Sequence, residues 1–326
     1  MIAATNIFSI NSQKEFHKIA LKIFRYQFEN NPVYHDFCVH LKKNPTNVKK
    51  ILDIPFLPIE FFKTHPIISL AVPNPTVFSS SGTTGSITSQ HLVSDISLYE
   101  ESYRRGFAWF YGAIENYTLL ALLPSYLERK GSSLIYMVED LIQKTNQPES
   151  GFYLHNHEEL IQKLRKLESA SENVLLMGVS YALLDLIEKL DFSLKNTIVM
   201  ETGGMKGKRK EMIREELHAL LSKGFGVPEI HSEYGMTELL SQAYSFGNGI
   251  FQCPPWMQVL IRDTEDALSW LENGKTGGIN VIDLANIHSC SFIATQDLGK
   301  KHDNQSFEVL GRFDNSDIRG CNLMVL

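Results

Sequence analysis

The chain has 326 residues, of which 43% are hydrophobic and 21% charged, and its formal net charge is -6. This composition predicts an ordinary globular protein with a large core, and the negative charge argues against nucleic acid as a partner. No apolar run approaches the roughly 18 residues of a membrane span, and the N-terminus lacks a basic region before an apolar stretch. We therefore expect a cytoplasmic protein that is not inserted in a membrane.

The first predicted element is an amphipathic helix. Ser12 and Glu15 have the spacing of a capping box, and apolar residues then recur at helical spacing from Phe16 until Asn30-Asn-Pro32. The apolar, proline-rich segment IPFLPIEFFKTHPI (residues 54–67) follows, and we expect it to lie over the core as a covered loop.

Continuous apolar runs then alternate with helix-like segments. The runs are YTLLALLPS (117–125), NVLLMGVS (173–180) and NTIVMETGG (196–204). This pattern predicts an α/β fold whose parallel or mixed sheet is flanked by helices. Ligands of such sheets bind beyond the carboxyl ends of the strands, which directs attention to the loops SSSGTTG (79–85), ETGGMKG (201–207) and HSEYGMTE (231–238).

Beyond about residue 243 the pattern becomes β-rich. The segments WMQVLIRD, GGINVIDL, SFIAT and FEVLGRF are separated by glycine, asparagine and aspartate. We therefore expect an α/β core over residues 1–242 and a smaller β-rich subdomain over residues 243–326.

The loop SSSGTTG combines hydroxyl side chains with glycines that let the backbone approach a ligand closely. It lacks the lysine of the GxxxxGK[ST] phosphate loop, so it predicts an anion cradle without a fixed positive charge. A flexible surface loop is the alternative interpretation. The residues of the expected cradle are Ser80, Ser81, Gly82, Thr83, Thr84 and Gly85.

The loop EYGMTE carries a second set of functional groups. Tyr234 offers a ring that suits stacking on a base, Thr237 offers a hydroxyl, and Glu238 offers a carboxylate for Mg²⁺. His231 either lines a substrate pocket or is a satisfied histidine at a strand end. Further on, Asp297 is placed to accept hydrogen bonds from ribose hydroxyls, and Arg312 and Asp314 follow.

The four cysteines, Cys38, Cys253, Cys290 and Cys321, are far apart and form no CxxC pair. This spacing favours reduced thiols over a disulfide framework. A zinc site made of Cys253, His288 and Cys290 is the weaker alternative.

Taken together, these motifs resemble the adenylate-forming superfamily of acyl-CoA ligases, peptide-synthetase adenylation domains and luciferases. SSSGTTG resembles its phosphate loop, ETGG its glycine pair, EYGMTE its YGxTE motif, QDLG its TGDxG-like motif and GRFDNSDIRG its hinge. The resemblance implies ATP and Mg²⁺ as cofactors, with Mg²⁺ at Glu238. It also implies a nucleotide site built from the cradle with Gly203, Gly204, Tyr234, Gly235, Asp297 and Arg312, and a substrate pocket that includes His231 and Met236.

Within that superfamily, FFKTHPI, SEYGMTELLSQAYS and RGCNL most resemble the LuxE-type long-chain acyl-protein synthetases. This resemblance implies that the protein activates a fatty acid, is acylated on its own Cys321, and passes the acyl group to a reductase or a carrier protein. Arg319 would then lower the pKa of the thiol. The alternatives are a ligase that uses coenzyme A or a carrier, and a non-catalytic nucleotide binder.

Two departures from the superfamily pattern concern positive charge. The phosphate loop continues as GSITSQ where most members have a proline-lysine pair, and only six residues follow Gly320, so we expect no full lid domain with its lysine. Either another cation offsets the charge on the phosphate, or adenylation is slow or needs a partner. The candidate cations are Lys206, Lys208, Arg209, Lys300 and Lys301.

Overall fold

The structure is a computed structural model that describes residues 4–80, 87–123, 131–154, 156–203, 209 and 212–312. None of the helices in these ranges is long and apolar enough to cross a membrane. Within the same ranges, no group of three or more histidine, cysteine, aspartate or glutamate side chains is arranged to hold a metal ion.

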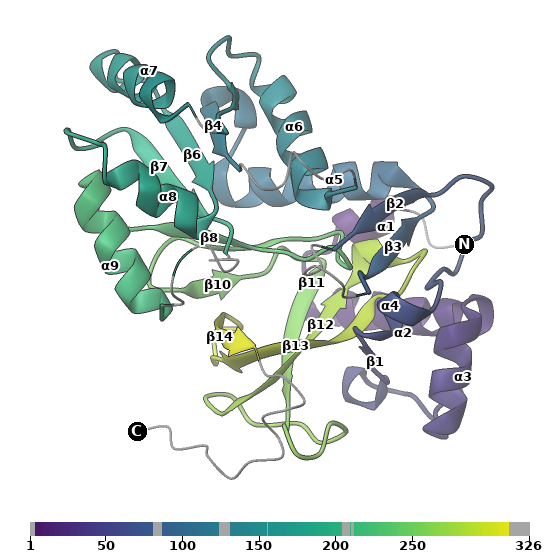
Figure 1. Ribbon diagram of the computed structural model, residues 1–326. Coiled ribbons are helices and arrows are strands. Elements are labelled where there is room, and N and C mark those ends of the chain that lie inside the picture. The colour runs from purple at the N-terminus through teal and green to yellow at the C-terminus, as the bar shows by residue number, and fades with distance from the viewer. Residues whose placement is uncertain are drawn as a thin grey trace.

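The N-terminal helices pack beside the C-terminal strands (Figure 1). They are α1 (Ala4–Phe8), α2 (Gln13–Asn30) and α3 (Pro32–His40), followed by the short helix η1 (Ile51–Asp53). The predicted helix start is confirmed, because the Ser12 hydroxyl accepts a hydrogen bond from the Glu15 amide (3.3 Å). On the buried face of α2, the Gln27 amide donates to the carbonyls of Asn286 (3.0 Å) and Ile287 (2.9 Å).

The segment 54–67 was expected to be a covered loop, and it also contains regular structure. It forms the strand β1 (Leu57–Pro58) and the helix α4 (Phe61–Thr64). β1 pairs in parallel with β13 (Phe292–Lys301), and the Ile59 amide donates to the Ala294 carbonyl (3.0 Å). These contacts are non-local, so the prolines of the segment did not indicate them.

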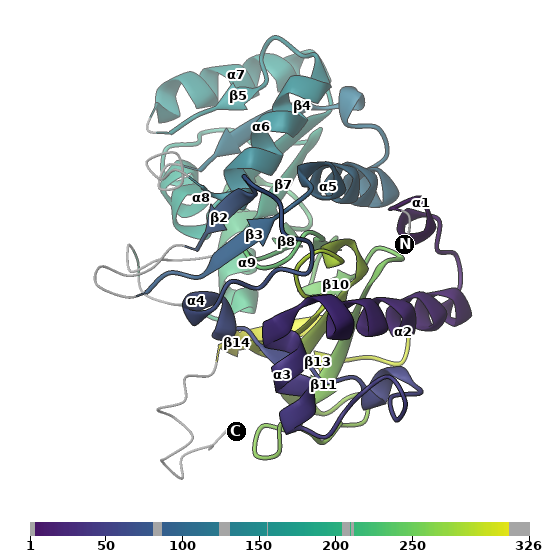
Figure 2. The same ribbon diagram turned by 90° about the vertical axis from the view of Figure 1, so that its right-hand side faces the viewer.

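The predicted parallel strands are confirmed and are neighbours in one sheet. The order is β8-β7-β6-β4-β5, with β4 (Thr118–Leu122), β5 (Gly151–Phe152), β6 (Val174–Gly178), β7 (Thr197–Glu201) and β8 (His231–Tyr234). Their continuous apolar sequence fits strands covered on both faces. The helices around them (Figures 1 and 2) are α5 (Ile96–Tyr111), α6 (Ser133–Thr145), α7 (His157–Ser169), α8 (Ser180–Ile187) and α9 (Arg214–Phe225), with η2 (Ile114–Asn116) after α5.

The expected β-rich part is antiparallel and continues the same sheet. It contains β9 (Ala243–Ser245), β10 (Ile250–Gln252), β11 (Met257–Arg262), β12 (Thr276–Asp283), β13 and β14 (Phe307–Arg312), with η3 (Leu284–Asn286) after β12. Twelve of the described strands thus form one mixed sheet. The predicted fold class is confirmed. Because β9 pairs with β8, the sheet contains strands from both sides of residue 242. The domain boundary at that residue stays a prediction.

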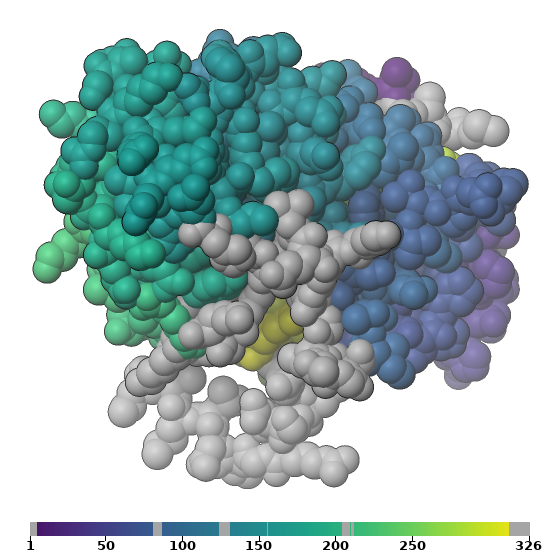
Figure 3. Space-filling view, turned by 45° about the horizontal axis from the view of Figure 1, so that its top comes forward, coloured from purple at the N-terminus to yellow at the C-terminus, as the bar shows by residue number. Residues whose placement is uncertain are grey.

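A separate two-stranded hairpin, β2 (Thr76–Ser79) and β3 (Gln90–Val93), carries the hydroxyl-rich loop. Figure 2 shows this hairpin beside α4. In the space-filling view, a small yellow surface of the C-terminal strands is visible between the teal-green and the blue parts of the chain (Figure 3).

Candidate active site

Two of the predicted loops leave the sheet side by side. β7 and β8 are parallel neighbours, and Glu201 lies opposite Ser232 in their register. The ETGG loop and the YGMTE loop therefore begin at the same edge of the sheet, where parallel α/β sheets bind their ligands. Gly203 has a φ of +79°, which favours glycine at this turn.

His91 connects the hairpin to the YGMTE loop. Its Nδ1 lies 2.9 Å from the Thr237 carbonyl oxygen and its Nε2 lies 3.0 Å from Asn286 Oδ1, while the Asn286 amide donates to the Glu238 carbonyl (2.8 Å). Burial lowers the pKa of His91 to about 4. His91 and Asn286 belong to no recognisable motif, so the sequence did not indicate these two contacts.

Glu238 lies beside the base of the hydroxyl-rich loop. Its side chain is buried and faces the Ser89 hydroxyl. Two hydrogen bonds connect Ser89 to Ser80. The Ser80 amide donates to the Ser89 carbonyl (3.0 Å), and the Ser80 hydroxyl accepts from the Ser89 amide (2.9 Å). Burial raises the pKa of Glu238, against the opposing effects of the Ser89 hydrogen bond and the charges of Arg312 and Lys63. Ser89 therefore links Ser80 to Glu238, and the binding roles of these two residues stay predictions.

Tyr234 on β8, Asp297 on β13 and Arg312 on β14 form a connected set of side chains. The Tyr234 hydroxyl donates to Asp297 Oδ2 (2.7 Å), and Arg312 Nε donates to Asp297 Oδ1 (3.2 Å). The Tyr234 ring is buried edge-on against Phe251 and Phe307, and this burial raises the pKa of its hydroxyl. Stacking of this ring on a base stays a prediction.

Glu201 is a buried carboxylate that organises the ETGG loop. Its Oε1 accepts from Ser232 (2.8 Å) and from Arg214, and its Oε2 accepts from the Gly203 amide (2.6 Å). Burial alone would raise its pKa, but the hydrogen bond from His218 and the charge of Arg214 outweigh that effect and lower the pKa to about 2. Glu201 therefore stays charged and holds the start of the loop in place.

A cavity of about 400 Å³ opens beside this loop. Its volume lies within the range of about 300–1,000 Å³ that small-molecule sites occupy. Its wall includes both polar and aliphatic side chains, and it reaches Gly311 on β14, next to Arg312. The principal lining residues are Glu201, Gly203, Met212, Arg214, Val309 and Gly311.

Glu233 is a second acidic side chain at this edge. Its side chain is partly buried. Loss of water around the carboxyl group, together with the negative charge of Glu201, raises its pKa to about 8. A Cβ atom on Gly235 would lie 2.4 Å from Glu233 Oε1, so the glycine of the YGMTE loop leaves room for this carboxyl group. The motif pattern did not indicate a role for Glu233.

The raised pKa of Glu233 predicts a specific pH dependence of stability. From its ordinary pKa of 4.5 up to about 8, the folded protein holds the proton and the unfolded chain does not, so stability falls as the pH rises. Relative to Glu233→Gln, the wild type should lose about 3 kcal/mol of unfolding free energy between about pH 5 and pH 8. Urea unfolding of both proteins across this range measures the difference, and two parallel curves would contradict the assignment.

The remaining predicted substrate-pocket residues lie near β8. His231 Nδ1 is 3.1 Å from the Tyr111 hydroxyl, and burial lowers the pKa of His231 to about 4. Met236 is partly buried in the loop after β8, and its carbonyl accepts from the Leu239 amide (3.1 Å). Their role in substrate binding stays a prediction.

Three of the candidate cations contact other parts of the structure. Arg209 pairs with Asp185 and with Glu188 (2.6 Å), and Lys300 pairs with Glu308 (2.9 Å). Lys301 lines a different pocket. The described cations whose charge acts on Glu238 are instead Arg312 and Lys63, and Lys63 was missed although it belongs to the quoted segment FFKTHPI.

Several predicted residues lie outside the described residues, and their roles stay predictions. They are Ser81, Gly82, Thr83, Thr84, Gly85, Gly204, Lys206, Lys208, Asp314, Arg319 and Cys321. Of the alternative zinc ligands, His288 Nδ1 lies 3.3 Å from the Tyr26 hydroxyl, and burial raises the pKa values of Cys253 and Cys290.

Comparison with solved structures places this arrangement among known folds. The chain matches 2-hydroxyisobutyryl-CoA ligase in complex with 2-HIB-AMP and CoA with a TM-score of 0.66 at 12% identity, covering 97% of this chain and 73% of the ligase. The chain has the fold of this ligase. A complex of the same ligase with R3-HIB-AMP gives a TM-score of 0.67 at 13% identity, over 92% of this chain and 68% of the ligase.

ATP-bound MatB from Rhodopseudomonas palustris also matches, with a TM-score of 0.56 at 17% identity over 75% of this chain. The chain spans about half the length of MatB, 49% of which is covered. No protein-family model and no curated protein matches the sequence. The chain therefore shares its fold with these solved structures.

Proposed function

We propose that this protein uses ATP to activate a carboxylic acid as an acyl adenylate. The observation that carries the proposal is the convergence, at one sheet edge, of the base of the hydroxyl-rich loop, Glu238, and the linked set of Tyr234, Asp297 and Arg312. The fold is shared with a CoA ligase whose structures hold an acyl-AMP and with an ATP-bound protein, which supports the same activity.

The first step joins the acid to AMP. A carboxylate oxygen of the acid attacks the α-phosphorus of ATP, and pyrophosphate leaves with the electron pair of the broken P–O bond. The protein contributes orientation and charge stabilisation rather than covalent chemistry. Backbone amides and hydroxyls around Ser80 would hold phosphate oxygens, and Asp297 would accept from a ribose hydroxyl.

Glu238 suits Mg²⁺, which prefers oxygen ligands and binds through one or two carboxylates together with substrate phosphates. Its carboxyl is buried next to a hydroxyl oxygen, and burial disfavours its charged form until a cation arrives. When bound, Mg²⁺ would neutralise phosphate charge. Lys63 and Arg312 would supply the remaining positive charge, in place of the lysine that the phosphate loop lacks.

In the second step the acyl group moves to a thiol. The resemblance to acyl-protein synthetases supports Cys321 as the acceptor and a fatty acid as the substrate. The thiolate attacks the acyl carbonyl carbon, AMP leaves, and a thioester forms. A reductase or a carrier protein would then take the acyl group.

The test is the intact-protein mass after incubation with ATP, Mg²⁺ and a mixture of short- to long-chain carboxylic acids, with Cys321→Ser alongside. We expect an acyl adduct that hydroxylamine removes, present on the wild type and absent from Cys321→Ser, and its mass identifies the acid. Cys290→Ser is the matched control, because Cys290 is buried and its pKa is raised, and it should keep the adduct.

The other outcomes separate the alternatives. Pyrophosphate release without an adduct, together with acyl-CoA formation that is undiminished in Cys321→Ser, indicates a ligase that uses coenzyme A. ATP binding without pyrophosphate release for any acid indicates a non-catalytic binder and overturns the proposed function.

A further inference from the structure

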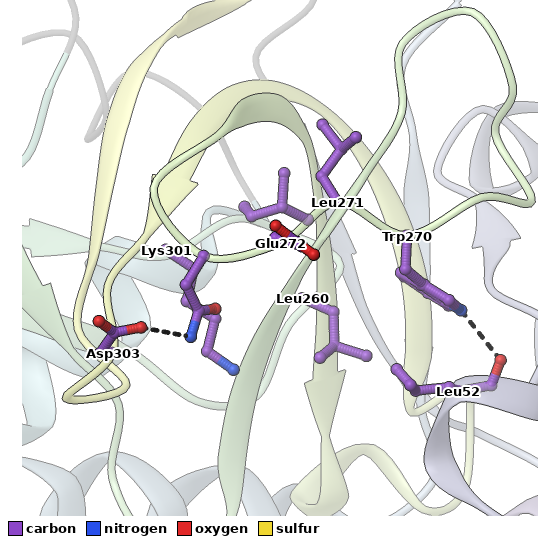
Figure 4. Close-up of a pocket in the computed structure, with 9 residues that line it drawn as sticks. Leu52, Leu260, Trp270, Leu271, Glu272, Lys301 and Asp303 are labelled. Atoms are coloured by element: carbon purple, nitrogen blue, oxygen red, sulfur yellow. Dashed lines mark hydrogen bonds between the residues drawn. The ribbon is translucent and has the colours of Figure 1, made fainter.

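A second pocket in the described part of the chain lies away from the candidate active site. It has a volume of about 520 Å³ and opens between η1, the loop after β11, and the turn that joins β13 to β14 (Figure 4). Lys301 lines it from β13, four residues beyond Asp297. Four residues of an extended strand span about 13 Å, so the two sites are distinct.

The pocket wall combines apolar and polar side chains. Leu260 and Leu271 form part of it, and Trp270 closes one side by donating from its indole N–H to the Leu52 carbonyl (3.0 Å). Leu52 is 46% exposed at this edge. Small-molecule sites of this volume commonly combine apolar side chains with a few polar groups.

Lys301 brings a positive charge into this pocket. Its side chain is buried, with 6% of the residue exposed, and burial lowers its pKa. Among the described residues its ammonium group has no ion-pair partner, because Glu308 pairs with Lys300 (2.9 Å) and Asp303 accepts from the Asn273 amide (3.1 Å). Figure 4 shows the amine of Lys301 pointing away from Asp303 and toward the side of Leu260.

Burying an ammonium group without a counterion is costly, and proteins normally pair such a charge. Lys301 therefore lacks an anionic partner among the described residues, and the apolar side chains of the wall favour an anion that carries an apolar body. The carboxylates of Glu272 and Asp303 at the rim repel a multiply charged ligand. These features select a monoanion with a hydrocarbon chain.

We propose that this pocket is a binding site for an aliphatic monocarboxylate, held by an ion pair with Lys301 and by contact of its chain with Leu52, Leu260 and Trp270. The site is separate from the one that would activate the acid, and the proposal does not depend on adenylation. A carboxylic acid bound here would be held by the protein without being consumed.

The experiment uses fluorine NMR of the full chain labelled with fluorotryptophan, titrated with octanoate in the absence of ATP. The chain has three tryptophans, and Trp270→Phe assigns the resonance that reports on the pocket. We expect octanoate to shift the Trp270 resonance saturably, and 1-octanol, which has the same chain without the charge, to bind at least about tenfold more weakly.

Lys301→Met should weaken octanoate binding at Trp270 by about 10- to 100-fold, because it removes a charge-assisted hydrogen bond. The control is Lys300→Met, which removes the neighbouring lysine on the same strand and should leave octanoate binding unchanged. Unchanged resonances of Trp109 and Trp256 show that both variants are folded. An unresponsive Trp270 resonance, equal affinities for octanoate and 1-octanol, or undiminished binding by Lys301→Met would each overturn the proposal.

Discussion

Replacing Glu238 with glutamine is expected to lower acid-dependent ATP–pyrophosphate exchange by about 100- to 1,000-fold. The carboxylate is buried beside the Ser89 hydroxyl and is the group proposed to hold Mg²⁺. Glutamine keeps the shape but loses the negative charge, and with it the preference of the site for a divalent cation. Exchange measured at several Mg²⁺ concentrations should show that the variant needs more Mg²⁺.

The stability of this variant separates chemistry from folding. Burial raises the pKa of Glu238, so removing its charge should leave the unfolding free energy equal or slightly higher. Glu172→Gln is the matched control, because Glu172 is an exposed glutamate outside the site, and it should keep full exchange. Wild-type exchange by Glu238→Gln would remove Glu238 from the proposed metal site.

Replacing Arg214 with methionine is expected to lower the free energy of unfolding by about 3 kcal/mol. Arg214 pairs with Glu201, which is only 2% exposed, and also donates to the Ser232 hydroxyl (3.2 Å). Without the guanidinium group, the carboxylate stays buried with less charge compensation. Urea unfolding at neutral pH measures the loss.

The double variant Arg214→Met with Glu201→Gln provides the control, because it removes the buried charge that Arg214→Met leaves uncompensated. It should recover much of the lost stability. The pH dependence gives a second check. The low pKa of Glu201 stabilises the fold above the ordinary value of 4.5, and this stabilisation is lost as the pH falls toward about 2. The difference between wild type and Arg214→Met should therefore shrink in that range, and a constant difference would contradict the charge-based explanation.

Local sequence patterns predicted much of the fold. The apolar runs that became β4, β6 and β7 are long, continuous and followed by helical periodicity, so their type and parallel pairing could be read directly. Ser12 likewise marked the start of α2, since its capping hydrogen bond is local. Features that depend on residues close in sequence could therefore be predicted from the sequence.

The parts that escaped prediction depend on distant residues. The strand β1 exists because Leu57 and Pro58 lie beside β13, more than 200 residues later in the printed sequence. His91 contacts the YGMTE loop across the fold, at Thr237 and through Asn286, and no motif surrounds either residue. A buried polar side chain becomes informative only when its partners are known.

In the candidate site too, local motifs were predicted and contacts between distant residues were not. The motifs located Glu238, Tyr234 and Asp297, but they did not indicate that the Tyr234 hydroxyl donates to Asp297 (2.7 Å). The candidate cations named from the sequence included Lys300 and Arg209, which pair with other carboxylates. Which cation faces Glu238 is set by the packing of α4 and β14 around the site, and that packing is not encoded in any single segment.

The measurement that tests the central claim most directly follows heavy oxygen from a labelled carboxylic acid into the products of ATP cleavage. If the acid attacks the α-phosphorus, one labelled oxygen stays on AMP after the acyl group leaves, and the pyrophosphate stays unlabelled. We predict labelled AMP from the wild type and none from Glu238→Gln under the same conditions. Label in inorganic phosphate together with ADP, or ATP cleavage that does not depend on the acid, would contradict acyl-adenylate formation.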